Sequence, residues 1–489
     1  MKKGTFSLVG SMLLLLSGVA ACGQNSGSSS KDITFWHCIG HDKMRNLQRI
    51  IDKFNEDHAA TDGYRIVPEK LAGAYDDLHD SVKTKLQAGF VPSITMGYPD
   101  SFSEYIGTKG EAGSQILKLD NLISSDTTFN KDEFVAGYYN EGTGYQYSGT
   151  WSVPLYKSTE VMYIDMEMFQ GTTLYKEHKD ETYGEYGAKI GDPSTWDWDT
   201  LVYVATEAQT ELGGKAKDFH ALGYDSDANL FISQMAMRGI AYTSAEGTGA
   251  DHFKFCDENG NANAELVSFA AQILDLTNTG ALVTQGSYGS YASDMFMSKK
   301  AMITIGSTGG SSYNDPMGST KAGFHCGIYA VPCYKGKENA KYIMQGPSLC
   351  FFNTKDSAKE KAAWEFYSKY VADATDNAAL ALENSYDPVK VSSYDTDVYK
   401  EYTALGKTKE GDDNLEQPLT YRIPNLTATL KDNYITSPVF NGSAKARSEI
   451  GQILKYAKTI SSGTSEAKVS SAIQKAFINC VNYIRGSGN

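Results

Sequence analysis

The sequence predicts an α/β protein with two lobes. Residues 33–97 follow a strand, helix, strand, helix, strand order, which is typical of a parallel sheet covered by helices. The chain has 489 residues, which is too long for one ordinary hydrophobic core. Val153-Pro154 predicts a stiff extended connector, because proline fixes its own backbone and holds the preceding residue extended. We expect the chain to leave one lobe for the other here.

The first lobe is expected to begin with alternating strands and helices. Their predicted ranges are 33–36, 44–54, 64–68, 75–88 and 91–97. Asp42 could cap the first helix, and Gly89 would end the second. Ligands of such sheets bind beyond the carboxyl ends of the strands. The residues at those ends are Trp36, His37, Tyr98 and Asp100.

Beyond the connector, the apolar pattern predicts a second set of strands and helices. The predicted strands are 161–164, 301–305 and 327–332, the last returning toward the first lobe. Residues 344–353 and the helix 360–371 are expected to belong to the first lobe. The tail predicts two long amphipathic helices, with Ile450, Ile453, Leu454 and Ala457 on the apolar face of the first.

The N-terminus has the pattern of a secretory signal. Lys2 and Lys3 precede a short apolar run, and small residues lead to Cys22. We interpret residues 1–22 as a lipoprotein signal peptide whose Cys22 carries lipid, and residues 23–31 as a flexible tether. The alternative is ordinary cleavage at the small residues, with an incidental cysteine.

Composition excludes some classes of function. The chain carries 45 basic and 59 acidic residues, for a net charge of −14, which argues against nucleic-acid binding. Its 32 tyrosines suit a polar ligand with apolar faces, although tyrosines on the surface and in the core would give the same count. The six cysteines after Cys22 contain no C-x-x-C, so we expect mostly free buried thiols.

No metal or cofactor is expected. The segment from Asp225 to Asn229 resembles the start of a calcium loop, but Leu230 and Ala236 replace the glycine and glutamate that such a loop requires. The glycine patterns that bind dinucleotides or phosphates are missing from the sequence, as are the G-x-S-x-G and H-E-x-x-H motifs of secreted enzymes. A lipid-anchored glycosidase remains the enzyme alternative, because many carboxylate pairs are present. A surface adhesin is a third class.

Several short motifs, in this order and spacing, resemble the extracellular solute-binding proteins of ATP-driven bacterial importers. They are ITFWH at 33–37, the crossover around Pro154, PSTW at 193–196, KKAMITIGS at 299–307, GIYAVP at 327–332, AAWEFYSKYV at 362–371 and SYDPV at 385–389. The resemblance implies a periplasmic-binding-protein-like clamp with the ligand between two lobes. It implies hinge closure and delivery to a membrane permease, by a monomer without catalytic activity.

The resemblance also implies lobe boundaries. Lobe one would comprise residues 32–153 and 344–375, and lobe two residues 154–343 and 376–489.

Within that family, the pattern is similar to the glycerol-phosphate binding branch. The residues that match its ligand contacts are Tyr75, Ser158, Gly346, Tyr386 and Arg422. A guanidinium can hold a phosphate through two parallel hydrogen bonds. However, that branch has tryptophans where this chain has residues 223–231 without one, and Asp100, Asp225 and Asp227 would repel a phosphate. We therefore place an oligosaccharide first and glycerol 3-phosphate or a glycerophosphodiester second.

The predicted ligand-binding residues combine these arguments. They are Trp36, His37, Tyr75, Asp100, Trp151, Ser158, Asp225, Ser307, Gly346, Tyr386 and Arg422.

Overall fold

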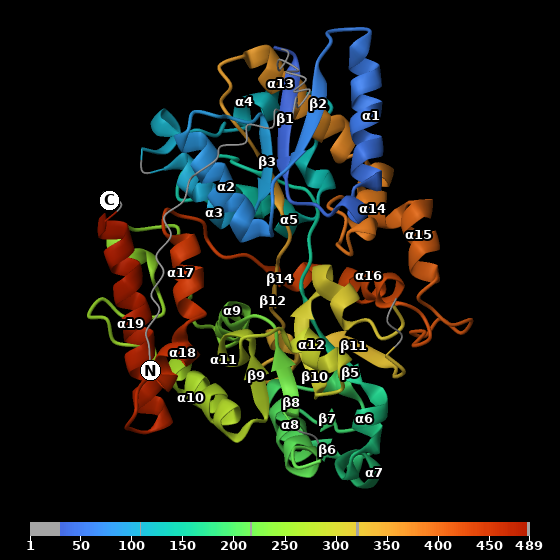
Figure 1. Cartoon of the computed structure of the whole chain (residues 1–489), viewed down its shortest axis with the longest axis vertical. Helices are drawn as coiled ribbons and strands as arrows, with labels where there is room; N and C mark the ends of the chain where they lie inside the picture. Colours follow the sequence, from blue (N-terminus) through green and yellow to red (C-terminus); the bar gives the residue numbers. More distant parts are fainter. Residues whose placement is uncertain (1–29, 108, 216–217, 319–321, 487–489) are drawn as a thin grey trace, which may run out of the picture.

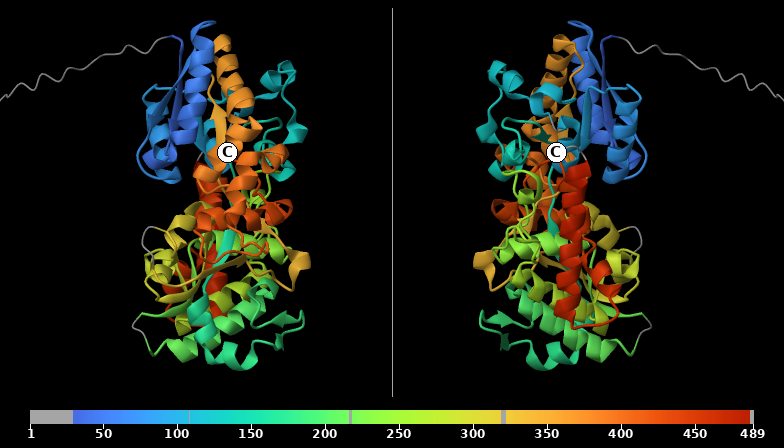
Figure 2. Two further views of the ribbon diagram at one scale, coloured as in Figure 1. Left: turned by 90° about the vertical axis from the view of Figure 1, so that its right-hand side faces the viewer. Right: turned by 90° about the vertical axis from the view of Figure 1, so that its left-hand side faces the viewer.

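The computed structural model describes residues 30–107, 109–215, 218–318 and 322–486. The predicted signal peptide, Cys22 and the tether up to residue 29 lie outside the described residues. The chain forms two lobes, one above the other, each built on a five-stranded sheet with helices on its faces (Figures 1 and 2). The predicted two-lobed α/β fold is confirmed.

The sheet of lobe one combines the predicted parallel strands with two later ones. In spatial order its strands are β2 (Arg65–Lys70), β1 (Asp32–His37), β3 (Ile94–Gly97), β13 (Ser348–Phe351) and β4 (Val153–Pro154). β1 is parallel to both β2 and β3, whereas β13 is antiparallel to β3 and β4. The helices that follow the first three strands are α1 (Arg45–Ala59), α2 (Tyr75–Gln87) and α3 (Pro99–Ile106).

The sequence predicted the buried face of α1 but not the residue at its N-cap. Leu47, Ile50 and Phe54 are buried on one face of α1, as their spacing requires. Asp42 does not cap α1, because it lies in a separate 3-10 turn (His41–Lys43) and Met44 occupies the N-cap position.

The sheet of lobe two is mixed. In spatial order its strands are β11 (Cys326–Ala330), β5 (Glu160–Asp165), β10 (Ala301–Ser307), β8 (His220–Tyr224) and β9 (Leu282–Thr284). β5 is antiparallel to both of its neighbours, and the other pairs are parallel. The strand expected at 327–332 therefore lies inside this sheet. Helices α8 (Trp198–Leu212), α9 (Asp227–Met237) and α10 (Ala264–Thr279) belong to this lobe.

The lobes are joined where segments far apart in sequence lie side by side. The crossover after β4 pairs through Ser158 with Gln345 and through Lys157 with Asp387. Beside it, β12 (Tyr342–Ile343) is parallel to β14 (Tyr434–Ile435), and Figure 1 shows this pair between the two sheets.

Three later helical segments pack on lobe one. They are α13 (Ser357–Glu365), a π-helical segment (Phe366–Val371) and α14 (Ala374–Glu383). Asn46 of α1 donates a hydrogen bond of 3.1 Å to the carbonyl of Ala379 in α14. Residues 376–383 thus contact lobe one, although the predicted boundary at residue 375 assigns them to lobe two.

The tail contains three helices instead of the two expected. They are α17 (Ser443–Ile450), α18 (Ile453–Lys458) and α19 (Ser465–Gly486). The first predicted helix is interrupted at Gly451, where the backbone passes close to α9: a Cβ on Gly451 would lie 3.3 Å from that of Ala228. α19 packs on α10, and α17 contacts α3 of lobe one.

The remaining described α-helices and strands have 12 residues or fewer. They are α4 (Asp120–Ser125), α5 (Ala136–Asn140), α6 (Met166–Gly171), α7 (Thr173–His178), β6 (Thr182–Tyr183), β7 (Ala188–Lys189), α11 (Gln285–Tyr288), α12 (Ala292–Met297), α15 (Asp397–Ala404) and α16 (Leu419–Leu430). Within the described ranges, no helix combines the length and apolar character needed to cross a membrane. All six described cysteines are free thiols.

Candidate ligand-binding cleft

A cavity of about 820 Å³ lies between the lobes. Lobe one lines it with Asp76, His79, Asp80, Tyr98, Asp100 and Ser101. Lobe two lines it with Ser226, Asp227, Ala228, Gln285, Gly286 and Gly289, and the tail with Ala444, Arg447, Ser448, Gly451, Gln452 and Lys455. Several of these residues directly follow the carboxyl ends of β3, β8 and β9, which is where α/β sheets bind ligands.

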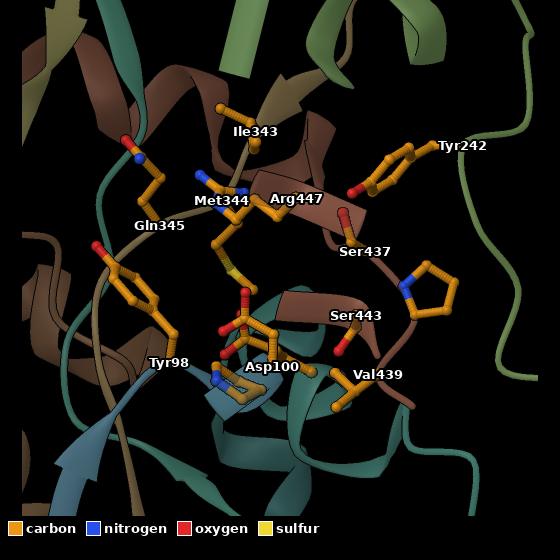
Figure 3. Close-up of a pocket in the computed structure, with 13 residues that line it drawn as sticks. Tyr98, Asp100, Tyr242, Ile343, Met344, Gln345, Ser437, Val439, Ser443 and Arg447 are labelled. Carbon is orange, nitrogen blue, oxygen red and sulfur yellow. The ribbon is translucent and has the colours of Figure 1, made fainter. Parts of the chain in front are cut away.

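A smaller pocket of about 60 Å³ adjoins this cavity (Figure 3). It is lined by Tyr98, Pro99, Asp100, Glu141, Tyr242, Ile343, Met344, Gln345, Ser437, Pro438, Val439, Ser443 and Arg447. Tyr98, Asp100 and Arg447 line both spaces, so they form the boundary between them. Lobe one, lobe two, the hinge and the tail all contribute to this pocket.

Carboxylates outnumber cations in the cavity. Among the described residues that line it, four are aspartates, and the lysine and arginine side chains are Lys455 and Arg447. The carboxylate of Asp227 is already hydrogen-bonded within the protein, since it accepts from the Thr284 hydroxyl (2.6 Å) and the Gly286 amide (2.8 Å). The cavity is therefore better suited to hydrogen-bond donors than to an anion.

Asp100 faces both spaces from the first turn of α3. One carboxylate oxygen accepts a hydrogen bond of 2.9 Å from the Ser101 amide. Burial raises the pKa of Asp100, while the positive charge of Arg447 opposes that change. Asp100 is thus a hydrogen-bond acceptor held close to a cation.

Arg447 is the main functional candidate that sequence reasoning missed. Its guanidinium donates to the side-chain oxygen of Asn229, whose amide nitrogen donates to Glu160 (2.7 Å). The other oxygen of Glu160 accepts from the Tyr224 hydroxyl (2.6 Å), and burial raises the pKa of Glu160 to about 7. This network fixes Arg447 against lobe two. The spacing of residues along α17 could have identified Arg447, because it lies three residues before the buried Ile450 and therefore on the same face of the helix.

Four tyrosines form a cluster beside the cavity. The hydroxyls of Tyr75 and Tyr386 lie 3.3 Å apart. The ring of Tyr98 lies 4.8 Å from that of Tyr75, and the ring of Tyr156 lies 4.4 Å from that of Tyr386. Of the predicted residues, the structure therefore brings Tyr75 and Tyr386 together next to Tyr98, a residue of the cavity wall.

Two predicted residues belong to the hinge. The Ser158 side chain is 1% exposed, and its hydroxyl has no hydrogen-bond partner among the described residues. Gly346 has a φ of +95°, and its carbonyl accepts a hydrogen bond of 3.2 Å from Lys157. Neither residue lines the two spaces described above.

Two others lie at strand ends in lobe two. Asp225 accepts a hydrogen bond of 2.7 Å from the Ala292 amide, and burial raises its pKa to about 6. The Ser307 hydroxyl accepts from the Gly309 amide (3.3 Å). Both side chains stabilise the local backbone and lie outside the two spaces.

Three of the predicted residues pack within lobe one. The Trp36 indole donates to Glu69 (2.8 Å), and that of Trp151 donates to the Tyr147 carbonyl (2.9 Å). His37 accepts from the Ile39 amide (3.2 Å), and burial lowers its pKa to about 4. All three lie outside the two spaces between the lobes.

Arg422 is also buried away from the cavity. Its guanidinium forms a two-pronged ion pair with Asp413, at 2.8 and 2.5 Å, and donates to the Cys326 carbonyl at 2.8 Å. Asp413 therefore occupies the fork that the sequence predicted for a phosphate. In the described ranges, no cluster of His, Cys, Asp and Glu side chains could hold a metal ion.

Comparisons with known proteins agree with this arrangement. The family model described as bacterial extracellular solute-binding protein matches residues 49–407. The sn-glycerol-3-phosphate-binding periplasmic protein UgpB of Agrobacterium fabrum is 24% identical over 384 residues, covering 75% of this chain and 76% of that protein.

Two solved structures illustrate the likeness in fold. UgpB from Mycobacterium tuberculosis in complex with glycerophosphocholine superposes with a TM-score of 0.64 at 15% identity, covering 93% of this chain and 99% of that one. The GacH receptor of Streptomyces glaucescens, solved unliganded and with acarbose, gives a TM-score of 0.61 at 15% identity, covering 91% and 98%.

Proposed function

The chain belongs to the bacterial extracellular solute-binding protein family, and from that premise we propose that it captures an oligosaccharide between its lobes. Members of this family are the non-enzymatic, substrate-binding components of ATP-driven importers. Hinge bending at the crossover would close the lobes on the ligand and produce the shape that a membrane permease recognises. Lipid on Cys22 would hold the protein at the outer face of the membrane.

The choice of an oligosaccharide rests on the charges that line the cavity. Asp76, Asp80, Asp100 and Asp227 line it, against Arg447 and Lys455. Carboxylates accept hydrogen bonds from sugar hydroxyls, whereas a phosphate dianion would meet like charges. The ring of Tyr98 adds an apolar surface on which a sugar can lie.

Glycerol 3-phosphate or a glycerophosphodiester is the second candidate. The relative from Agrobacterium fabrum, which covers 75% of this chain, is an sn-glycerol-3-phosphate-binding protein, and Arg447 lines both spaces. A guanidinium at this position could pair with a phosphate. We rank this candidate second because the surrounding aspartates would repel a phosphate.

A thermal-shift screen tests the proposal. The soluble protein from residue 23 onward is incubated with maltotriose, cellotriose, raffinose, sn-glycerol 3-phosphate and glycerophosphocholine. A specific ligand at ~100 Kd stabilises the folded state by about 2.7 kcal/mol. We expect a shift with an oligosaccharide. A shift with the phosphate compounds alone would favour the second candidate.

A charge variant distinguishes the two candidates further. Asp100→Asn should weaken oligosaccharide binding, because it removes a charged acceptor from the cavity wall. The same change should strengthen phosphate binding if that candidate is correct. Asp52→Asn, at an exposed position outside the cavity, is the matched control.

A further inference from the structure

The small pocket contains a buried hydroxyl that forms no hydrogen bond within the described part of the chain. The Tyr242 side chain is 9% exposed, and its hydroxyl has no hydrogen-bond partner among the described residues. Its ring lies near that of Phe255, with centroids 6.2 Å apart and 20° between the planes. A buried polar group without a partner costs free energy, and one that lines a pocket can be satisfied by a ligand.

The Tyr242 hydroxyl stays protonated at ordinary pH. Burial raises the pKa of Tyr242 well above its usual value. The hydroxyl can therefore donate one hydrogen bond and accept others. Figure 3 shows this hydroxyl directed toward the side of the pocket that holds Arg447 and Ser437.

Other residues that line the pocket carry complementary groups. Asp100 of lobe one supplies an acceptor, and Arg447 of the tail supplies donors. A group that both donates and accepts satisfies all three side chains, and an alcohol hydroxyl is such a group. A phosphate only accepts, so it would leave Asp100 facing oxygen atoms.

The size of the pocket limits what can enter. Its volume of about 60 Å³ takes a group of roughly two to four non-hydrogen atoms, not a whole sugar ring. Because Tyr98, Asp100 and Arg447 also line the larger cavity, such a group could project from a ligand bound there.

We propose that this pocket binds a hydroxyl-bearing end of the ligand, such as a hydroxymethyl group or a terminal diol, through Tyr242, Asp100 and Arg447. The inference rests on the proposed oligosaccharide function and adds the group by which the ligand is selected. Tyr242 belongs to lobe two and Asp100 to lobe one, so the bound group contacts both lobes.

The test is the change Tyr242→Phe, which removes one oxygen atom. Isothermal titration measures the affinity of wild type and variant for maltotriose, cellotriose and raffinose. We expect a three- to tenfold loss for the oligosaccharide that binds, which corresponds to about one hydrogen bond. The melting temperature of the unliganded variant should be unchanged or higher, because no described residue bonds to the removed hydroxyl.

A matched control separates binding from folding. Tyr138→Phe removes the same atom from a fully buried tyrosine outside both spaces, and should leave the affinity unchanged. Equal affinities of wild type and Tyr242→Phe for a bound oligosaccharide would overturn this inference and leave the proposed function intact. Binding of no ligand in the set would overturn both. Binding of sn-glycerol 3-phosphate alone would overturn the proposed oligosaccharide function only, because that ligand also ends in a diol; equal affinities of wild type and Tyr242→Phe for it would then overturn the inference as well.

Discussion

The ammonium group of Lys157 forms a buried ion pair with the carboxylate of Glu141 where the chain crosses between the lobes. The Lys157 side chain is fully buried, and it also donates to the Gly346 carbonyl (3.2 Å) and the Ser348 hydroxyl (2.9 Å). Burial lowers the pKa of Lys157, against the opposing influence of Glu141. Since Glu141 also lines the small pocket, the pair connects the hinge to the pocket wall.

Glu141→Gln should destabilise the protein strongly. The change leaves the Lys157 ammonium buried without an opposite charge, which typically costs about 3–5 kcal/mol. Urea unfolding of wild type and variant measures the loss. Adding Lys157→Met to Glu141→Gln removes the unpaired charge, so the double variant should recover most of the stability. Equal stability of wild type and the single variant would contradict the prediction.

Glu160 should make stability depend on pH. Its pKa rises from 4.5 to about 7 on folding, so between these values the folded chain holds more protons than the unfolded chain. The free energy of unfolding therefore falls as pH rises through this range, by on the order of 3 kcal/mol. Glu160→Gln should flatten this part of the profile, measured by urea unfolding from pH 4.5 to 8. Parallel profiles for variant and wild type would refute this assignment.

Gly346→Ala should disturb the hinge. Gly346 has a φ of +95°, and a Cβ there would lie 2.7 Å from the Tyr156 carbonyl oxygen. We expect a loss of about 2–4 kcal/mol, from backbone strain together with the steric clash. Gly63→Ala is the control, because Gly63 has a φ of +75° but no atom within 4 Å of the added Cβ. Gly63→Ala should cost about 1 kcal/mol. Equal losses for the two variants would show that crowding at the hinge is unimportant.

Arg422→Lys should reduce stability and leave ligand affinity unchanged. Lysine cannot reproduce the two-pronged pair with Asp413 or the bond to the Cys326 carbonyl, so we expect a loss of about 1–3 kcal/mol. Thermal unfolding measures the stability, and titration with the oligosaccharide that binds and with sn-glycerol 3-phosphate measures the affinity. Unchanged stability with a loss of phosphate affinity would instead support the ligand role predicted from the sequence.

Local patterns in the sequence were sufficient for most of the fold. The strand expected at 161–164 is β5 (Glu160–Asp165), and the helix expected at 75–88 is α2 (Tyr75–Gln87). The strand was predictable from its run of strand-forming residues. The helix was predictable from its apolar residues spaced four apart and from the glycine that follows it. The break in the tail at Gly451 was not predicted, because it depends on a contact with α9, which is remote in sequence.

The site was harder to predict than the fold. Position at a strand end identified Asp100, which lines both spaces. The same criterion also selected Trp36, which lines neither space, since its indole donates to Glu69 of β2. A position at a strand end does not tell which way the side chain points. Tyr242 follows α9 in a segment without periodicity, so no sequence pattern marked it.

The position of β13 constrains the order in which the protein can be completed. All five strands of the second sheet lie between residues 160 and 330, so that sheet can form as soon as this stretch has been made or exported. The first sheet cannot close until Ser348–Phe351 arrives to bridge β3 and β4. The sheet that begins the chain is therefore the later one to be completed, and a polypeptide truncated before residue 348 would contain all strands of the second sheet but not those of the first.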